Sequence, residues 1–221
     1  MLRRMLIFCL LSGNTLAVSR PHEVIFGKWM TVQWLVGANE TQTQNLKVRA
    51  LFVAGRAKEF TIGPPHEVTD RLFVVRRAFR VNDALPGENA TPLRWRWQRG
   101  GWLLVDRVTG RISAITLPDF DSYYSSGSWY RDYLAYCGVS EDGRKISALV
   151  VELGRRKPVL KQPLHDLPAG DLPDSGCSPP EWQRQPARVT FWQANGQKLT
   201  YNILGHAFDV VNDNYEEEGT E

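Results

Sequence analysis

The sequence lacks the short motifs that mark common nucleotide-binding, hydrolytic and metal sites. It contains no G-x-x-x-x-G-K-[ST] segment, no dinucleotide-binding fingerprint and no G-x-S-x-G elbow. Its 4 histidines form no H-x-x-x-H or H-E-x-x-H pair, so we predict no metal ion and no cofactor. These absences exclude the enzyme classes that such motifs define, and leave catalysis only to residues that are far apart in the sequence.

Long apolar runs and strong net charge are also absent. After the N-terminal residues no segment stays apolar for about 18 positions, and no window of about 12 residues has a helical period. We therefore expect no transmembrane segment. The 27 Lys and Arg residues are nearly balanced by 24 Asp and Glu residues, which excludes the basic composition of nucleic-acid-binding domains. We expect no nucleic-acid partner.

The N-terminal residues have the order of a secretory signal. In RRMLIFCLLSGNTLAVS, a basic pair precedes a short apolar run, and small residues three positions apart follow it. We predict a signal peptide at residues 1–19, cleaved after Ala17 or Ser19, and an exported mature chain that is periplasmic or secreted. The alternative is a buried N-terminal strand or helix.

Cysteine is scarce, with 3 residues in the whole chain. Removal of the predicted signal removes Cys9 and leaves Cys137 and Cys177. An even pair in an exported protein predicts a disulfide bond, and a loop of 40 residues gives it a stabilising effect of about 4 kcal/mol. The alternative is two unpaired thiols.

Short apolar runs separated by glycine turns predict an all-β fold. Asp-Gly, Asn-Gly and Thr-Gly between such runs are typical of hairpins, because glycine reaches positive φ without a steric penalty. We count about 11 strands and predict antiparallel meanders, propeller-like or arranged as an irregular sandwich or barrel. Glu141 and Asp142 are interpreted as residues of one such turn, between Tyr130–Val139 and Lys145–Leu153.

The spacing of the turns divides the predicted single domain, which covers residues 20–205. Two blade-like units are expected at residues 46–99 and 101–153, followed by a Pro-rich loop at 154–186 and a C-terminal hairpin at 187–204. The loop holds 7 of the 13 prolines, and a bond to Cys177 would fix it to the sheet. Residues 206–221 are predicted to be an acidic, disordered tail.

Two resemblances accompany this pattern. The turn S-E-D-G-R-K-I, from Ser140 to Ile146, resembles the S-x-D-G-x-x-I element in the blades of TolB-like propellers. The run FGKW, GGWLLVDRVTG, SWYRDYLAYCGVSEDGRK and GRRKPVL is similar to a family of exported bacterial proteins with no established activity. The first resemblance implies blade-like β repeats and the second an envelope location, and neither implies site residues.

A Trp- and Arg-rich segment is the candidate binding surface. In LRWRWQ, Trp95 and Trp97 are expected on one face of a strand and Arg94 and Arg96 on the other. Arg76 and Arg80 lie one strand earlier. Tryptophan beside arginine offers stacking area and bidentate donors, which suits a protein or glycan partner. The alternative is a Trp ladder in the core with supporting arginines outside.

These observations favour a non-enzymatic exported protein that binds or scaffolds a partner. The alternative is a hydrolase with a dispersed acid/base site at Asp119, Asp121 and His66, in which the D-x-D spacing places two carboxylates on one side of an extended segment. The sequence leaves the ligand and the oligomeric state open. One remaining possibility is a partial propeller that closes by self-association.

Overall fold

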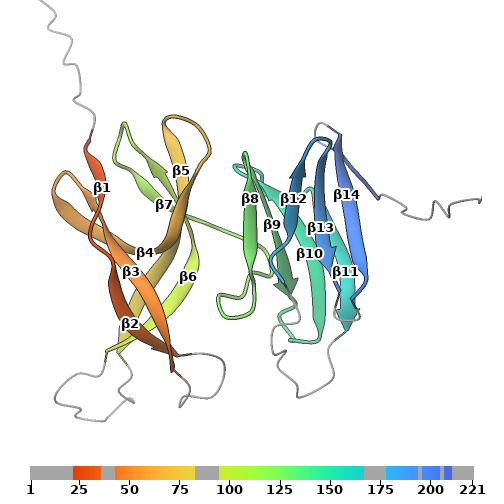
Figure 1. Cartoon of the computed structure of the whole chain (residues 1–221), viewed down its shortest axis with the longest axis horizontal. Helices are drawn as coiled ribbons and strands as arrows, with labels where there is room; N and C mark the ends of the chain where they lie inside the picture. The colour runs from red at the N-terminus through yellow and green to blue at the C-terminus, as the bar shows by residue number, and fades with distance from the viewer. Residues whose placement is uncertain are drawn as a thin grey trace, which may run out of the picture.

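The computed structural model describes residues 22–35, 43–82, 95–166, 178–193, 196–204 and 207–210. These residues form 15 strands and no helix. The strands belong to three sheets of 7, 4 and 4 strands, which lie one after another along the molecule (Figure 1). The chain is therefore all-β, and its pairings are antiparallel with one exception, as the sequence predicts. The number of strands is larger than the 11 expected.

The first sheet closes on itself. Its strands are β1 (Val24–Phe26), β2 (Met30–Leu35), β3 (Thr43–Val53), β4 (Arg56–Glu67), β5 (Leu72–Asn82), β6 (Trp95–Asp106) and β7 (Ile112–Ile115). β3 pairs with β2 and β4, β4 pairs with β5, and β5 pairs with β6. A parallel contact between β2 and β6, at Trp34 and Trp97, completes the circuit. We call β2 to β6 the ring. β1 adds to β3, and β7 adds to β6.

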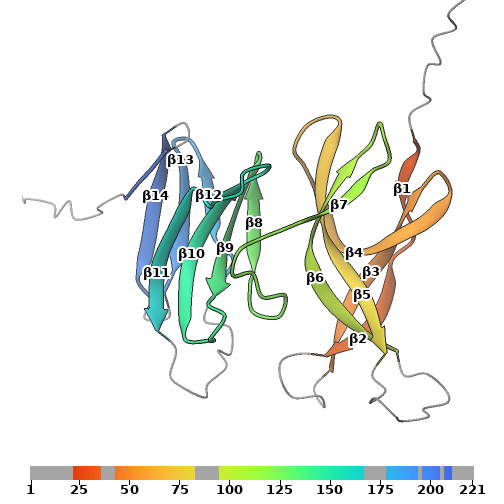
Figure 2. The ribbon, with the colours of Figure 1, turned by 180° about the vertical axis from the view of Figure 1, so that it is seen from behind.

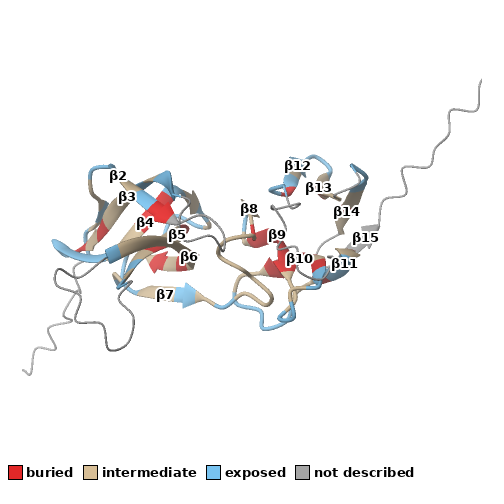
Figure 3. Ribbon diagram, turned by 90° about the horizontal axis from the view of Figure 1, so that it is seen from below, coloured by how far each residue is buried: buried red, intermediate tan, exposed pale blue. Residues whose placement is uncertain are grey.

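The second sheet is the middle layer of the molecule. It contains β8 (Gly127–Tyr130), β9 (Tyr133–Val139), β10 (Lys145–Glu152) and β11 (Leu160–Asp166), in the order β11-β10-β9-β8. β9 and β10 are apolar on both faces, as a strand covered on both sides must be. Leu134, Tyr136 and Leu149 pack toward Trp102 of the ring, whereas Ala135 and Val150 pack toward the third sheet. Figure 3 shows buried residues inside the ring and along β9 and β10.

The third sheet covers the far side of the middle layer. It contains β12 (Glu181–Arg184), β13 (Ala187–Trp192), β14 (Lys198–Leu204) and β15 (Ala207–Val210). Val189, Phe191 and Tyr201 are buried against the middle layer. The pairing of β13 with β14 confirms the C-terminal hairpin. Trp182 joins the two sheets, because its indole Nε1 donates to the carbonyl of Ser128 at 2.9 Å.

The structure divides the chain differently from the predicted units. The segment 46–99 lies in the four consecutive strands β3 to β6, but β2 closes them into the ring. The segment 101–153 is divided between two sheets: β7 pairs with β6, and β8 to β10 belong to the middle layer. Figure 2 shows the connection after β7 crossing from the ring to the middle layer. The spacing of the turns does not predict this division, because a turn does not specify which sheet the next strand joins.

The Pro-rich segment 154–186 contains regular strands, although a loop is expected there from the sequence. It contains β11 and β12. Pro163 is tolerated in β11 because this strand pairs only with β10 and faces a register shift between Ile146 and Ser147. Residues 207–210, assigned by sequence to a disordered tail, form β15 beside β14. The predicted signal peptide and residues 211–221 lie outside the described residues.

The predicted turn at Glu141 and Asp142 and the cysteine at position 137 both lie in the β9–β10 hairpin. Gly143 has φ +68° and its N–H donates to the Ser140 carbonyl at 2.8 Å, while the Asp142 carboxylate accepts from the Ser140 hydroxyl at 2.5 Å. Asp142 is therefore a turn residue. Cys137 is buried in β9 and is disulfide-bonded. Cys9 and Cys177 lie outside the described residues, so the pairing of Cys137 with Cys177 stays a prediction.

Candidate functional site

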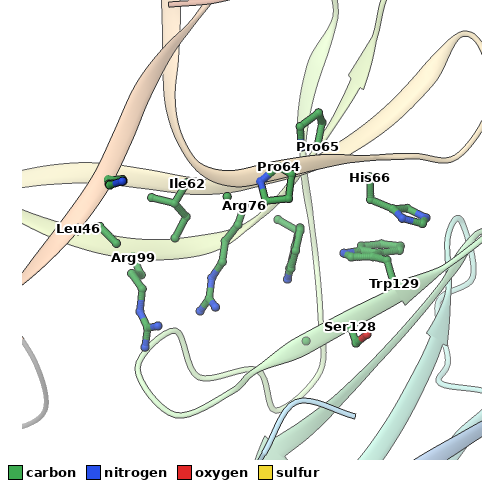
Figure 4. Close-up of a pocket in the computed structure, with 13 residues that line it drawn as sticks. Leu46, Ile62, Pro64, Pro65, His66, Arg76, Arg99, Ser128 and Trp129 are labelled. Carbon is green, nitrogen blue, oxygen red and sulfur yellow. The ribbon is translucent and has the colours of Figure 1, made fainter. Parts of the chain in front are cut away.

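A cavity of about 570 Å³ lies between the ring and the middle layer. β3 to β6 form one side of it, and Gly127, Ser128 and Trp129 of β8 form the other (Figure 4). Lys47, Arg76 and Arg99 line it, so we call it the arginine cavity. None of the described residues that line it is a carboxylate. Its volume is that of an ordinary small-molecule site.

A bulge in β4 brings His66 to the cavity. The register of β4 against β5 shifts between Ile62, opposite Arg76, and His66, opposite Val74. The residues between them, Gly63-Pro64-Pro65, are left out of the ladder, where the missing N–H of proline does no harm. Gly63 has φ +68°, a conformation that glycine adopts readily. The bulge therefore carries an imidazole and two proline rings to the wall of the cavity.

A second bulge places Arg99 beside Arg76. Arg76 lies opposite Trp102, whereas Ala78 lies opposite Arg99, so β6 has one more residue than β5 at Gly100-Gly101. Arg99 and Trp102 are three positions apart and would point to opposite faces of a regular strand. The extra residue returns them to the same face. Figure 4 shows the side chains of Arg76 and Arg99 extending in the same direction.

Within the described part of the chain, the two arginines donate only to neutral acceptors. Arg76 donates to the carbonyls of Gly100 at 3.2 Å and Ser122 at 2.9 Å, and Arg99 donates to the Tyr123 carbonyl at 2.9 Å. These bonds hold the loop before β8 against the ring. They do not neutralise either guanidinium, and no carboxylate among the described residues pairs with either one. The positive charge of the cavity therefore has no carboxylate partner among the residues that the structure describes.

Neighbouring arginines differ from Arg76 and Arg99, because they pair with carboxylates. Three of them have carboxylate partners, in the pairs Arg71–Asp106, Arg77–Glu59 and Arg107–Glu67. Burial, and to a smaller extent the charge of Arg99, lower the pKa of Arg76 from its ordinary value to about 10. Burial also lowers the pKa of Arg99. Both groups remain charged at neutral pH, and a bound anion would relieve the penalty that lowers these pKa values.

Three buried N–H donors near the arginines have no acceptor. They are Arg99 Nε, Trp102 Nε1 and Trp129 Nε1. Leaving a buried donor unpaired costs about 1–3 kcal/mol. All three residues line the arginine cavity. The three N–H groups themselves are buried, so they lie behind the surface that the cavity exposes.

An aromatic group closes the side of the cavity nearest β8. His66 stacks on Trp129 with ring centroids 5.8 Å apart, and Trp129 meets Trp102 edge to face at 5.5 Å. His66 Nε2 donates to the Arg131 carbonyl at 2.8 Å. These contacts join the ring to the middle layer. They also hold the two indoles in fixed positions.

The structure brings together only part of the predicted binding surface. Arg80 lies 5.6 Å from the Trp95 ring and 5.5 Å from the Trp97 ring. Trp95 is 53% exposed, whereas Trp97 packs on Phe60 at 5.0 Å and supports the ring interior. Arg96 is the partner of Val81 in the β5–β6 ladder. Arg94 lies outside the described residues, and the role of Trp95 and Arg80 in binding a partner stays a prediction.

Arg76 is predicted to share a surface with Trp95 and Trp97, but it lines the arginine cavity instead. Sequence reasoning did not select Arg99, Trp102 or Trp129. The predicted units end at 99 and begin at 101, whereas β6 continues through Gly100-Gly101. A Gly-Gly pair inside an alternating segment is a signal of a bulge, and it was the available indication that Arg99 and Trp102 face the same side.

The three groups of the acid/base alternative each have another partner. The Asp119 carboxylate accepts from Lys161 Nζ at 2.6 Å. The Asp121 carboxylate accepts from the backbone N–H groups of Tyr123 at 2.7 Å and Tyr124 at 3.2 Å, which caps the loop before β8. His66 is bonded to a backbone carbonyl. Within the described residues no contact joins these three groups, and the hydrolase alternative stays a prediction without support from their geometry.

The described residues contain neither a metal-binding cluster nor a helix that could span a membrane. No group of three or more His, Cys, Asp or Glu side chains in them is arranged to hold a metal ion. Among them there is also no helix with the length and hydropathy needed to span a bilayer.

No protein-family model, curated protein or solved structure matches the chain. The resemblances to TolB-like blades and to exported bacterial proteins therefore stay expectations.

Proposed function

We propose that this chain is an exported, non-enzymatic binding protein whose ligand is an anion held in the arginine cavity. The observation that supports the proposal is the pair Arg76 and Arg99, two half-buried guanidiniums whose described partners are neutral carbonyls. A guanidinium matches the geometry of a carboxylate or phosphate and loses less hydration than an ammonium on burial. The signal-like residues 1–19 and the expected Cys137–Cys177 bond support the exported location.

Lys47 adds a third positive charge at the opening. It is exposed, lies on β3 and lines the same cavity. A cation at the rim steers anions toward the entrance, and the buried pair then holds them. An approaching anion would meet no described carboxylate on the cavity wall. This arrangement favours binding over acid/base catalysis, because the charges are permanent at neutral pH.

The test is calorimetric titration of the mature protein with acetate and with inorganic phosphate at low ionic strength. We expect binding of at least one anion, weakened by added salt. The Arg76→Gln and Arg99→Gln variants should each lose at least about 10-fold in affinity, since a hydrogen bond to a charged group contributes about 1.5–3 kcal/mol.

Lys47→Gln provides a variant that breaks no internal hydrogen bond, because the structure records none for Lys47. It should weaken anion binding by a few-fold without lowering stability. Arg56→Gln is the matched control, an exposed arginine at the β3–β4 turn and outside the cavity. Undetectable binding of both anions to the wild-type protein would overturn the proposal, as would equal losses in Arg56→Gln and Lys47→Gln.

A further inference from the structure

The outer edge of β7 has no strand partner among the described residues. β7 pairs only with β6, with Ser113 opposite Leu104. In the turn between these two strands, the Asp106 N–H donates to the Arg111 carbonyl at 3.0 Å. Because the hydrogen bonds of an antiparallel pair alternate along the strand, Ser113 bonds to β6, and Ala114 turns its N–H and C=O to the free edge. Ala114 is exposed.

Two other described edge strands carry residues that discourage the addition of a further strand. β11 holds Lys161 and Pro163, and β12 begins with Glu181 and ends with Arg184. Charged residues and proline are common protection of a sheet edge. β7 has the sequence Ile-Ser-Ala-Ile and contains neither. Figure 3 shows β7 at the margin of the first sheet. Its edge therefore lacks this protection.

A cavity of about 680 Å³ lies beside this edge. Leu72, Leu104 and Ile115 line it from the first sheet, and residues 153–156 line it from the turn after β10. Ala114 lines it too, although its side chain points to the opposite face from that of Ile115. The cavity therefore reaches the backbone edge of β7, and we call it the β7 groove. It shares no described lining residue with the arginine cavity.

The side of the β7 groove formed by the turn after β10 is positively charged. Arg155 and Arg156 line it and are exposed. Arg155 pairs with Glu152 at 3.1 Å, whereas Arg156 has no carboxylate partner among the described residues. None of the described residues that line the groove is a carboxylate. A ligand in the groove therefore meets backbone hydrogen-bonding groups, an apolar wall and an unpaired cation.

We propose that β7 binds an extended peptide segment of a partner protein, which adds to the sheet as a further strand. The peptide residue opposite Ala114 exchanges both backbone hydrogen bonds with it. The peptide residues on either side of that one are apolar and point over the groove, because successive side chains alternate between the faces of a strand. An acidic residue of the same segment lies against Arg156. This site is separate from the arginine cavity and does not rest on the proposed anion site.

Other occupants use only part of this arrangement. A fatty acid would fit the apolar wall and Arg156, but it would leave the N–H and C=O of Ala114 without partners. β7 of a second copy would supply an edge strand, but its sequence brings no acidic residue to Arg156. An extended peptide with apolar and acidic residues matches the edge, the wall and the charge together.

The test selects binders of the immobilised mature protein from a phage-displayed library of random peptides of about 8 residues, an ordinary strand length. We expect the selected peptides to alternate apolar residues and to contain Asp or Glu. Each selected peptide is then synthesised and titrated. Ala114→Pro removes the N–H at the free edge and no bond to β6, so it should weaken binding by at least about 10-fold. Ala114→Val keeps the N–H and should stay within about 2-fold of the wild type.

N-methylated peptides test the same pairing on the wild-type protein, and decide the matter if Ala114→Pro does not fold. Methylation of alternate peptide nitrogens in one register removes the donors to β7 and should weaken binding by at least about 10-fold. Methylation in the other register should change it by about 2-fold or less. Arg156→Gln should weaken binding by about 3-fold, the effect of an exposed ion pair, and Arg56→Gln is the matched control that should not.

Several results would overturn the proposal. They are failure to select any peptide, equal affinity of folded Ala114→Pro and the wild type, and equal losses in the two N-methylation registers. Dimers that light scattering detects in the wild type but not in Ala114→Pro would assign the edge to a second copy instead. None of these results bears on anion binding, so this proposal and the proposed function fail separately.

Discussion

Asp106 is the residue that fixes the end of β6 and the turn that follows it. Its carboxylate accepts from Arg71 Nε at 2.9 Å and from the backbone N–H groups of Val108 at 2.9 Å and Thr109 at 3.2 Å. The hydrogen bond from Arg71 is the main reason that the pKa of Asp106 lies well below its ordinary value, and the N–H donors add to it. A carboxylate with a depressed pKa stabilises the folded state only while it is ionised.

We predict that Asp106→Asn lowers the melting temperature by several degrees at pH 7. The amide keeps an acceptor for the turn but loses the charge that holds Arg71. Because the pKa is lowered on folding, the contribution of Asp106 is complete above its unfolded value of about 4 and is lost as the pH falls further. The difference in melting temperature between the variant and the wild type should therefore become smaller from pH 7 to pH 2.

Thermal unfolding followed by circular dichroism measures this gap. Glu141→Gln is the control, an exposed carboxylate on the tip of another hairpin, and it should change the melting temperature little at any pH. A gap for Asp106→Asn that keeps its full size at pH 2 would show that charge is not the source of the stabilisation.

At the scale of elements, Gly138 shows how closely the middle layer is packed. A Cβ on this buried residue of β9 would lie 2.5 Å from Leu149 Cδ1 and 2.9 Å from Asp119 Cβ. The backbone of the linker contributes to the crowding, because the Val139 N–H donates to the Asp119 carbonyl at 2.8 Å. The linker between β7 and β8 therefore lies directly on β9.

We predict that Gly138→Ala destabilises the protein by about 1–3 kcal/mol, the usual effect of overpacking a core position. Gly101→Ala is the matched control, since a Cβ at Gly101 meets nothing within 4 Å. Urea unfolding of both variants gives the comparison. Similar midpoints for Gly138→Ala and the wild type would mean that the linker can move away from β9.

The elements that the sequence predicts well are those set by local chemistry. The β9–β10 hairpin follows from apolar runs around Asp142-Gly143, and the β13–β14 hairpin from Asn195-Gly196. The ring closure could not be predicted in this way. It depends on a contact between Trp34 and Trp97, which are far apart in the sequence and whose strands share only this registered pair. No local pattern specifies such a pairing.

The candidate site was predictable only in part for the same reason. Arg76 was singled out as a binding residue, but its partners Arg99, Trp102 and Trp129 come together through two bulges and a contact between sheets. A bulge changes which face a side chain occupies, so strict alternation assigns the residues beyond it to the wrong side. The three glycines and two prolines at these bulges are the features of the local sequence that indicate this geometry.

At the scale of the whole molecule, a small set of contacts joins the ring to the middle layer. Trp129 is central to it, since it touches His66 and Trp102 of the ring and packs with Leu134 of the middle layer. Arg76 and Arg99 hold the intervening loop by its carbonyls. The arginine cavity is formed by the same contacts. Ligand binding and the docking of the ring on the middle layer should therefore depend on each other.

We predict that Trp129→Ala lowers the free energy of unfolding by about 3 kcal/mol, the lower end of the range for a truncated core tryptophan. It should also make the linker between β7 and β8 more susceptible to limited proteolysis, because the ring would no longer be held against β8. Trp95→Ala is the matched control: its ring is 53% exposed, so the change should stay within about 0.5 kcal/mol. Equal destabilisation by the two variants, or a linker as resistant to protease in Trp129→Ala as in the wild type, would show that the ring and the sheets stay joined without this contact.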